Sequence, residues 1–460
     1  MRKQKTVNSG NKITSNAEIT KYLRTFANKI KPSKHMEINY KPRIADKLLT
    51  KKLASKGAVL IEGPKWCGKT TTAEQCAKSI LYMDDPSRLR SNLQLAEVNP
   101  EMLLEGDKPR LIDEWQLAPN LWDTIRFAVD HHPGVSQYIL TGSAVPAEEG
   151  KMHHSGTGRI SWLTMRPMSL YESGESTGQV SLSDLFNAPE KIAGTNKLSL
   201  QDIAFLICRG GWPFATLLKG DAALSQAFDY VDAVIKKDIS RVDNVRRNPT
   251  TARLLMRSYA RNIASQAALT TIVADMSTNA EEEVSEKTAA AYIEALRKLF
   301  VIEDSEAWNP NLRSKSAIRT GNTRYFVDPS IGTAVLRLGP DDLLKDLHTM
   351  GLFFETMCVR DLRVFADALD GEIYKFRDRN GLECDAVIHL HNGKYGLIEI
   401  KLGGDTYIEE GAENLKNLAS KIDTTKMNPP SFLMVLTGVG DYAFRRPDGV
   451  YLVPIGCLKD

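Results

Sequence analysis

The stretch Gly63-Pro64-Lys65-Trp66-Cys67-Gly68-Lys69-Thr70 fits G-x-x-x-x-G-K-S/T, the pattern of a phosphate-binding P-loop. The run 57–62 before it is apolar and β-branched, which predicts a buried parallel strand. Residues 71–78 after it have the composition of a helix. The glycines allow backbone N–H groups to turn toward a phosphate, and the helix N-terminus adds a partial positive charge. The alternative is a strand-to-helix turn that contains glycines by chance.

The motif assigns specific roles if the bound ligand is ATP with Mg²⁺. Lys69 would reach the β- and γ-phosphates, and the hydroxyl of Thr70 would bind the metal ion. We expect the nucleotide to contact the whole loop and the first helical turn, which comprise Gly63, Pro64, Lys65, Trp66, Cys67, Gly68, Lys69, Thr70 and Thr71.

Two later strands are predicted to end beside this loop. The run 109–115 is an apolar strand that ends in Asp113 and Glu114, which is the Walker B pattern. Asp113 would hold Mg²⁺ through water, and Glu114 would polarise the attacking water. The strand 136–143 ends in polar residues, so Thr141 or Ser143 would sense the γ-phosphate. The alternative is that Thr141 and Ser143 only cap the next turn.

Composition and charge limit the kinds of protein that this chain can be. The net charge of +3 is too small to indicate nucleic-acid binding by itself. Residues 1–34 carry nine Lys/Arg and one Glu, so a basic arm of about +8 precedes a slightly acidic remainder. The arm would contact nucleic acid or an acidic partner, or remain a solvated tail with one helix at 17–30.

The cysteines and the N-terminus favour a cytoplasmic protein. The six cysteines are scattered and form no C-x-x-C or zinc spacing, so we expect reduced thiols. No apolar run approaches the length of a membrane span, and the N-terminus has no secretory h-region.

The order of P-loop, Asp-Glu strand, Leu-Thr-Gly-Ser strand and Gly158-Arg159 resembles the AAA superfamily of ring ATPases. That resemblance implies a homo-oligomeric ring, with a hexamer as one form, in which an arginine of one subunit reaches the γ-phosphate held by its neighbour. Arg159 lies where this arginine finger would fall, and Arg166 is the alternative. Arg209 would contact nucleotide from a helical lid. The alternative for Arg159 is a surface arginine in a loop.

The next part of the chain is predicted to be helical. The mixed-charge run 236–243 would be a solvated face, and helices are expected at 269–276 and 286–299. Strands at 300–302 and 323–328 would complete a winged helix, a DNA-binding architecture. Its second helix would offer Lys287, Thr288, Arg297 and Lys298 to DNA, and the wing would offer Arg313, Lys315 and Arg319. The alternative is a winged helix that serves packing or protein contact.

The C-terminal part resembles the restriction-endonuclease-like fold. The residues that carry this resemblance are Glu355 in the helix 347–369, Asp385 at a strand 383–390, and Glu399-x-Lys401 in the return strand 395–401. The resemblance implies a second Mg²⁺ site formed by Glu355, Asp385, Glu399 and the carbonyl of Ile400, with Lys401 orienting water. Domains of this fold also occur without known cleavage activity.

The chain as a whole resembles prokaryotic AAA-type P-loop ATPases with a winged helix and a C-terminal nuclease-like domain of uncertain function. The expected fold is α/β, with a basic arm at 1–39, an ATPase domain at 40–205, a helical and winged-helix domain at 206–340 and a nuclease-like domain at 341–460. We predict an ATP-hydrolysing motor or switch acting on branched, forked or double-stranded DNA. The rival hypotheses are an ATP-gated nuclease and a signalling ATPase that binds proteins.

Overall fold

The computed structural model describes residues 40–142, 156–243, 245–278, 284–311 and 321–460. Its contacts divide the chain into two units, Met1–Lys41 and Pro42–Asp460. The predicted basic arm and its helix at 17–30 lie outside the described residues. No helix in the described ranges is long and apolar enough to cross a membrane.

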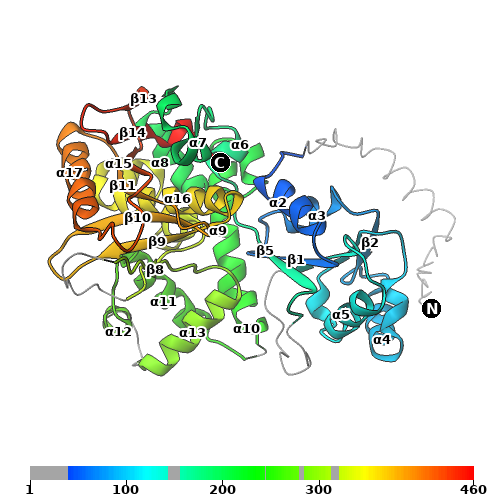
Figure 1. Cartoon of the computed structure of the whole chain (residues 1–460). Coiled ribbons are helices and arrows are strands. Elements are labelled where there is room, and N and C mark those ends of the chain that lie inside the picture. The colour runs from blue at the N-terminus through cyan, green and yellow to red at the C-terminus, as the bar shows by residue number, and fades with distance from the viewer. Residues whose placement is uncertain (1–39, 143–155, 244, 279–283, 312–320) are drawn as a thin grey trace, which may run out of the picture. The chain divides into compact units, whose positions relative to one another are not determined.

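A five-stranded parallel sheet supports the P-loop, with the strand order β2-β3-β4-β1-β5 (Figure 1). Strand β4 lies between β1 and β3, and Thr141 is the register partner of both Ile61 and Asp113. The ends of these three strands therefore meet at one edge of the sheet. The strands are β1 Ala58–Glu62, β2 Ser79–Tyr82, β3 Arg110–Asp113, β4 Tyr138–Gly142 and β5 Ile160–Thr164.

Helices cover both faces of this sheet. Because side chains alternate along a strand, Val59 and Ile61 join the core that includes Leu49, whereas Leu60 joins the core that includes Trp122. Leu49 belongs to a helix on the first face and Trp122 to a helix on the second. The helices of this part are α2 Ile44–Leu53, α3 Lys69–Glu74, α4 Leu89–Val98, η1 Pro100–Leu104, η2 Trp115–Leu117, α5 Leu121–His131 and α6 Leu170–Ser173.

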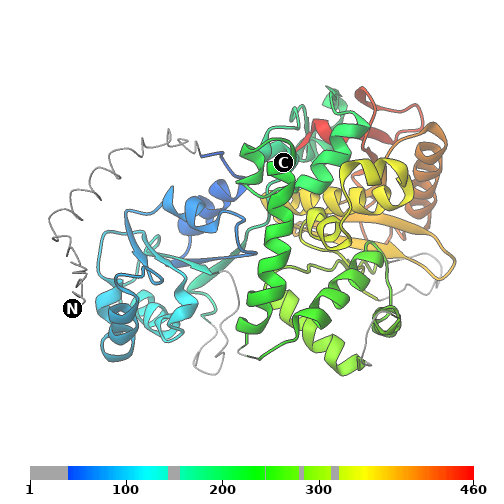
Figure 2. The same cartoon turned by 180° about the vertical axis from the view of Figure 1, so that it is seen from behind.

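A helical region follows. Helix α9 packs against α8 and α14, and the helices of this region lie in front of the C-terminal sheet in Figure 2, which is seen from behind. The predicted helices at 269–276 and 286–299 form as α12 and α13, and the side chain of Ser285 caps α13 by accepting from the N–H of Thr288. The helices are α7 Leu182–Asn187, η4 Pro189–Lys191, α8 Leu200–Arg209, η5 Ala215–Leu217, α9 Gly220–Ala233, the π-helix η6 Val234–Asp238, α10 Ile239–Arg241, α11 Pro249–Arg261, α12 Leu269–Ser277, α13 Glu286–Lys298, α14 Pro329–Leu336 and α15 Pro340–Lys345.

The segments predicted as strands at 300–302 and 323–328 lie antiparallel to each other but form no continuous strands. In the described residues they make two isolated antiparallel bridges, Ile302 with Phe326 and Ser305 with Thr323. Phe300 adopts a φ of 56°, which turns the chain sharply after α13. The chain then forms β8 (Glu306–Ala307), which pairs in parallel with β9 of the C-terminal sheet. The proposed wing residues Arg313, Lys315 and Arg319 lie outside the described residues.

An eight-stranded mixed sheet forms the C-terminal part, in the order β7-β13-β14-β12-β11-β10-β9-β8. Helix α16 packs on one face with Ile398 and Ile400, and α17 packs on the other face with Leu397. The predicted helix at 347–369 and the predicted strands at 383–390 and 395–401 are present. The elements are α16 Leu347–Ala368, β9 Gly371–Arg377, β10 Glu383–Leu390, β11 Tyr395–Lys401, α17 Asp405–Lys421, β12 Phe432–Thr437, β13 Tyr442–Arg445, β14 Tyr451–Pro454 and η7 Ile455–Cys457.

Two contacts connect the C-terminal strands to residues far earlier in the chain. Strand β7 (Gly194–Thr195) extends the eight-stranded sheet by pairing with β13. Strand β6 (Val180–Ser181) pairs in parallel with β15 (Leu458–Lys459). Both strands of the segment 180–195 therefore pair with strands from the end of the chain, β7 in the eight-stranded sheet and β6 in a separate two-stranded sheet. The sequence alone groups this segment with the ATPase domain.

Candidate functional site

The P-loop connects β1 to α3 through backbone conformations that glycine makes possible. Gly68 has a φ of 99° immediately before α3, and Gly63 has a φ of 145°. A Cβ atom at position 63 would overlap the carbonyl oxygen of Met165, so this position also needs glycine for space. Trp66 has a φ of 66° and is 53% exposed at the tip of the loop.

The amine of Lys69 is directed into its own loop. Its Nζ donates to the carbonyl oxygen of Gly63 at 2.9 Å and to that of Pro64 at 2.8 Å, and the residue is buried. Both acceptors are neutral. A phosphate would bind this ammonium more strongly than the carbonyl oxygens do, because the attraction between opposite charges adds to the hydrogen bond.

Asp113 gathers two hydroxyl groups at the edge of the sheet. Thr70 donates to Asp113 Oδ1 at 2.8 Å, and Thr141 donates to the same oxygen. Burial raises the pKa of Asp113, while these two hydrogen bonds oppose the rise. The residues expected to bind Mg²⁺, Thr70 and Asp113, are thus in direct contact, and Thr141 adjoins them. An oxygen-only set of this kind suits Mg²⁺ together with phosphate and water.

Glu114 is held in a strained backbone conformation. Its φ of 54° and ψ of 42° place a residue with a Cβ in the left-handed region. Its carboxylate accepts a hydrogen bond from the side-chain amide of Gln116. Burial raises the pKa of Glu114, opposed by this hydrogen bond. The strain fixes the direction in which the carboxylate leaves the strand end, next to Asp113.

Arg43 is a site residue that sequence reasoning missed. This buried guanidinium donates to Cys67 O in the P-loop at 2.8 Å, to Glu172 Oε1 at 3.0 Å and to Arg166 O at 2.8 Å. It therefore fixes the P-loop to the segment that follows β5. Arg43 lies outside every sequence motif, so no local pattern indicated this role.

The helical region reaches the P-loop through η6. Lys65 Nζ lies 2.6 Å from Asp238 Oδ1, and the ring of Trp66 lies 5.9 Å from that of Tyr230 in α9. Asp238 is buried, so the prediction that residues 236–243 form only a solvated face is wrong at this position. A π-helix inside a helical run often marks a functional site.

The three arginines considered as nucleotide contacts have different surroundings. Arg159 is half exposed, and its Nε lies 2.6 Å from Asp130 Oδ1. Arg166 is largely buried and ion-paired with Glu303 and Asp367, so its guanidinium already has partners within the chain. Arg209 is buried and ion-paired with Glu175.

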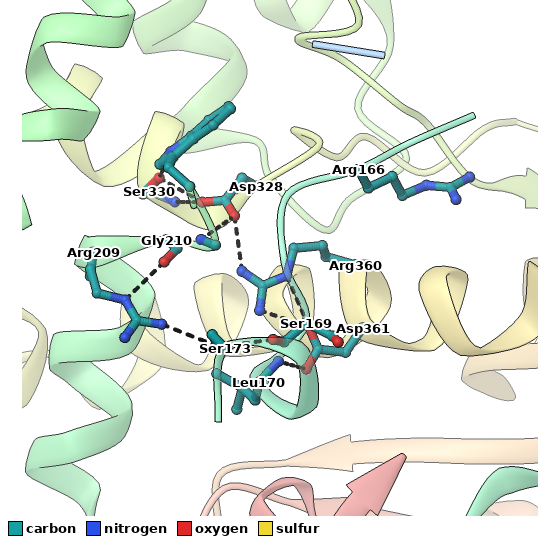
Figure 3. Close-up of polar contacts among 12 residues, drawn as sticks. Arg166, Ser169, Leu170, Ser173, Arg209, Gly210, Asp328, Ser330, Arg360 and Asp361 are labelled. Atoms are coloured by element: carbon teal, nitrogen blue, oxygen red, sulfur yellow. Dashed lines mark hydrogen bonds and ion pairs between the residues drawn. The ribbon is translucent and has the colours of Figure 1, made fainter. Parts of the chain in front are cut away.

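A buried ion-pair network connects the segment after β5, which contains Leu170, to helix α16. Figure 3 shows Arg360 between Asp328 and Asp361, with nitrogen–oxygen distances of 2.9 and 2.6 Å. Asp361 also accepts from the N–H of Leu170, and Asp328 accepts from that of Gly211. The residues after β5 and after α8 are therefore fixed by charges on α14 and α16.

The residues proposed to contact DNA lie on α13. Lys287 and Arg297 are exposed, and Lys298 is partly buried. Arg297 pairs with Asp304 at 2.8 Å, so part of its charge is neutralised within the chain. The helix therefore presents basic side chains, with Lys287 near its start and the other two in its last turn.

The C-terminal residues predicted to bind metal meet in one buried cluster. Glu355 from α16 pairs with Lys375 of β9 at 2.7 Å, and Lys401 pairs with Glu399 at 2.7 Å and with Asp385 at 3.4 Å. The N–H of Ile400 donates to Asp385. In the described residues, no group of three or more His, Cys, Asp or Glu is placed as in a preformed metal site. The second Mg²⁺ site therefore stays a prediction.

Three family models match separate parts of this chain. An AAA domain matches residues 55–174, which span the P-loop, Asp113, Glu114 and Thr141. Two domains of unknown function follow, DUF8612 at residues 200–342 and DUF4143 at residues 350–458. The candidate nucleotide site lies wholly within the AAA match, except for Arg43 and Asp238.

Among known proteins, the chain is similar to the uncharacterized proteins Rv2008c of Mycobacterium tuberculosis and Mb2031c of Mycobacterium bovis. Each is 23% identical over 349 residues, which cover 75% of this chain and 70% of the relative. Among solved structures, the Walker-type ATPase PABY2304 of Pyrococcus abyssi is 16% identical, with a TM-score of 0.40 over 67% of this chain and 99% of that one. A single-residue variant of RuvB from Thermotoga maritima is 15% identical, with a TM-score of 0.25 over 56% and 88%. The match to the AAA domain, together with the geometry of its P-loop, supports a P-loop ATPase family for this chain.

Proposed function

We propose that this protein is an ATP-hydrolysing motor or switch that acts on DNA. The observation that carries the ATPase part is the contact of Thr70 and Thr141 with one oxygen of Asp113, next to the P-loop lysine. Side chains from α3, β3 and β4 converge there, which a chance glycine turn would not produce. The AAA match covers the same residues.

The proposed chemistry assigns one task to each residue. Lys69 leaves the two loop carbonyls and binds the phosphates, while Thr70 and Asp113 hold Mg²⁺. The metal ion, when bound, neutralises phosphate charge. Glu114 orients and polarises the attacking water, and Thr141 senses the γ-phosphate. Arg43 keeps the P-loop in register with the segment after β5 throughout.

We propose that α11, α12 and α13 form the DNA-contacting unit. The exposed Lys287, with Arg297 and Lys298, would bind phosphates of a duplex, and branched or forked DNA is the substrate class that the resemblance to AAA rings suggests. If the partner is instead a protein, the same residues would make contacts that depend less steeply on salt.

We propose that the protein works as a homo-oligomer, with a hexameric ring as one form. Arg159 supports this proposal because it is half exposed and, in the described residues, contacts Asp130 and Thr157 O at the surface. It would exchange Asp130 for the γ-phosphate of a neighbouring subunit. Mixing Arg159→Ala subunits with Lys69→Ala subunits should restore partial activity. No recovery in confirmed mixed assemblies would contradict an arginine acting in trans.

We place this activity in the cytoplasm. All six cysteines are free thiols and five of them are buried. This state agrees with a reducing compartment, in which disulfides are rare.

The test of the function is ATP hydrolysis measured with and without a panel of single-stranded, duplex, forked and four-way DNA. We expect stimulation by at least one DNA form and DNA binding that weakens steeply with salt. Lys287→Ala should reduce the slope of log K for DNA binding against log salt concentration by about 1. Lys345→Ala, which changes an exposed lysine on α15, should leave this slope unchanged. Hydrolysis that is indifferent to every DNA form, with unchanged binding in Lys287→Ala, would contradict the DNA proposal.

A further inference from the structure

Five charged side chains form an alternating chain beneath α16. Lys375 Nζ lies 2.7 Å from Glu355 Oε1 and 3.4 Å from Asp385 Oδ1. Lys401 Nζ lies 3.4 Å from Asp385 Oδ2 and 2.7 Å from Glu399 Oε2. The order is therefore carboxylate, ammonium, carboxylate, ammonium, carboxylate. The residues come from one helix and three strands, so the tertiary fold brings them together.

Because these carboxylates are buried, their negative charges need the neighbouring ammonium groups of Lys375 and Lys401. The side chains of Lys375, Asp385 and Glu399 are 7%, 7% and 1% exposed. A buried charge that loses its partner costs several kcal/mol. Three carboxylates this close would repel one another strongly without cations between them. Two lysines supply that positive charge from within the chain.

Most of the carboxylate oxygens are already occupied by donors. Glu355 Oε1 accepts from Lys375 and from the hydroxyl of Tyr325. Asp385 Oδ2 accepts from the N–H of Ile400 and from Lys401. In the described residues, Glu399 Oε1 is the only oxygen of the three carboxylates that is recorded as buried without a hydrogen-bond partner.

We infer that the ammonium group of Lys375 takes the place of a divalent cation between Glu355 and Asp385. A metal ion that bridged these two carboxylates would need oxygen atoms at about 2.0–2.6 Å on several sides. The Lys375 amine already lies between the same two carboxylates, and its charge repels a second cation. Two of the three carboxylate charges in this cluster are thus balanced by lysines of the chain itself, and the place between Glu355 and Asp385 is taken without a metal ion.

The inference goes beyond the proposed ATPase and is independent of it. It separates this domain from metal-dependent phosphodiester cleavage, since the residues expected to hold Mg²⁺ hold lysines. It also makes a positive prediction about a variant. Replacing Lys375 by methionine keeps much of the side-chain length but removes the charge, so Glu355, Asp385 and Glu399 would face one another and form a divalent cation site.

Binding of Mn²⁺ to the nucleotide-free full chain tests the inference by electron paramagnetic resonance and thermal unfolding. The Asp113→Asn background keeps metal away from the nucleotide site. With the cluster intact, we expect no cluster-bound Mn²⁺ up to ~1 mM and no change in Tm on adding Mn²⁺. With Lys375→Met added, we expect a lower Tm, one bound Mn²⁺ per chain and a Tm that rises with Mn²⁺. Adding Glu399→Gln should remove this binding.

Lys51→Met is the matched control, because Lys51 forms an exposed ion pair with Asp370. It should leave both Tm and Mn²⁺ binding unchanged. Two results would overturn the inference. One is Mn²⁺ bound by the chain with the intact cluster and lost in Glu399→Gln, a result that does not depend on whether Lys375→Met folds. The other is a folded Lys375→Met chain that gains no Mn²⁺ site.

Discussion

Lys69 in the P-loop and Lys375 in the C-terminal sheet are both buried lysines surrounded by oxygen atoms, but the oxygens differ in charge. Lys69 donates to two neutral carbonyls of its own loop. Lys375 lies between two carboxylates, those of Glu355 and Asp385. A phosphate can replace carbonyls at the first lysine with a gain in charge pairing. At the second lysine, any ligand must compete with partners that already carry full negative charge.

This difference distinguishes a lysine that is available to a ligand from one that serves the fold. Around Lys69, the neighbouring groups also fit a ligand, because Thr70 and Asp113 offer oxygen atoms beside the loop. Around Lys375, the neighbouring carboxylates form ion pairs with lysines of the same chain. Charge balance inside the chain therefore favours the P-loop as the reactive centre and the C-terminal cluster as a support.

The largest effect is expected from Glu114→Gln. The amide keeps the shape of the side chain but cannot polarise water as a carboxylate does, so kcat should fall by about 10²-fold or more. ATP binding should persist, because Lys69 and Thr70 are unchanged. Steady-state hydrolysis and equilibrium binding of ATP measure the two effects separately. Glu101→Gln, an exposed glutamate in η1, is the control, and a wild-type rate in Glu114→Gln would refute the role of Glu114.

A moderate effect is expected from Asp238→Asn. Asp238 competes with phosphate for Lys65, which lies 2.6 Å from it. Because Lys65 is partly exposed, releasing it is worth at most about 1 kcal/mol, or roughly a fivefold increase in ATP affinity. Calorimetric titration with ATP checks this. Asp232→Asn is the control on α9, since Asp232 pairs with Lys236 and Arg253 instead. Weaker ATP binding in Asp238→Asn would show that Asp238 supports the loop.

The smallest effect concerns Arg166 and the dependence of stability on pH. Burial tends to raise the pKa of Glu303, but the charges of Arg166 and Arg363 outweigh it and lower the pKa to about 2. The stabilisation from this lowered pKa is complete above the ordinary glutamate pKa and is lost as the pH falls toward 2. Urea midpoints at pH 5 and pH 3 should therefore differ less in Glu303→Gln than in wild type.

The control for this comparison is Glu97→Gln, an exposed glutamate on α4. It should retain the wild-type difference between the two pH values. If Glu303→Gln also retained it, Glu303 would not titrate as a partner of Arg166, and the structural assignment of Arg166 would lose its support.

Local patterns in the sequence were enough to predict the elements that form the candidate nucleotide site. The strand before Gly63, the helix after Gly68 and the strand ending in Asp113 each depend on residues close in sequence. The placement of Thr141 between the ends of β1 and β3 also follows from the strand order. Short-range backbone preferences and the period of apolar residues determine these features.

Contacts between distant residues were not predictable in the same way. Arg43 reaches Glu172 across 129 residues of sequence. Asp238, in the π-helix η6, meets Lys65 across 173 residues. The ion pairs of Lys375 could not be predicted from the sequence around it, because its partners Glu355 and Asp385 come from α16 and β10. The two predicted wing segments are joined by isolated bridges, and residues between them form β8, which pairs with the distant strand β9.

The most direct test of this account is ATP affinity in two matched variants, Lys69→Ala and Lys401→Ala. Each removes one lysine from a cluster of oxygen atoms, the first from the P-loop and the second from the more open side of the C-terminal cluster. Equilibrium binding of labelled ATP with Mg²⁺ should be lost in Lys69→Ala and unchanged in folded Lys401→Ala. Unchanged ATP affinity in Lys69→Ala, with the fold confirmed by circular dichroism, would contradict the assignment of the P-loop as the nucleotide site.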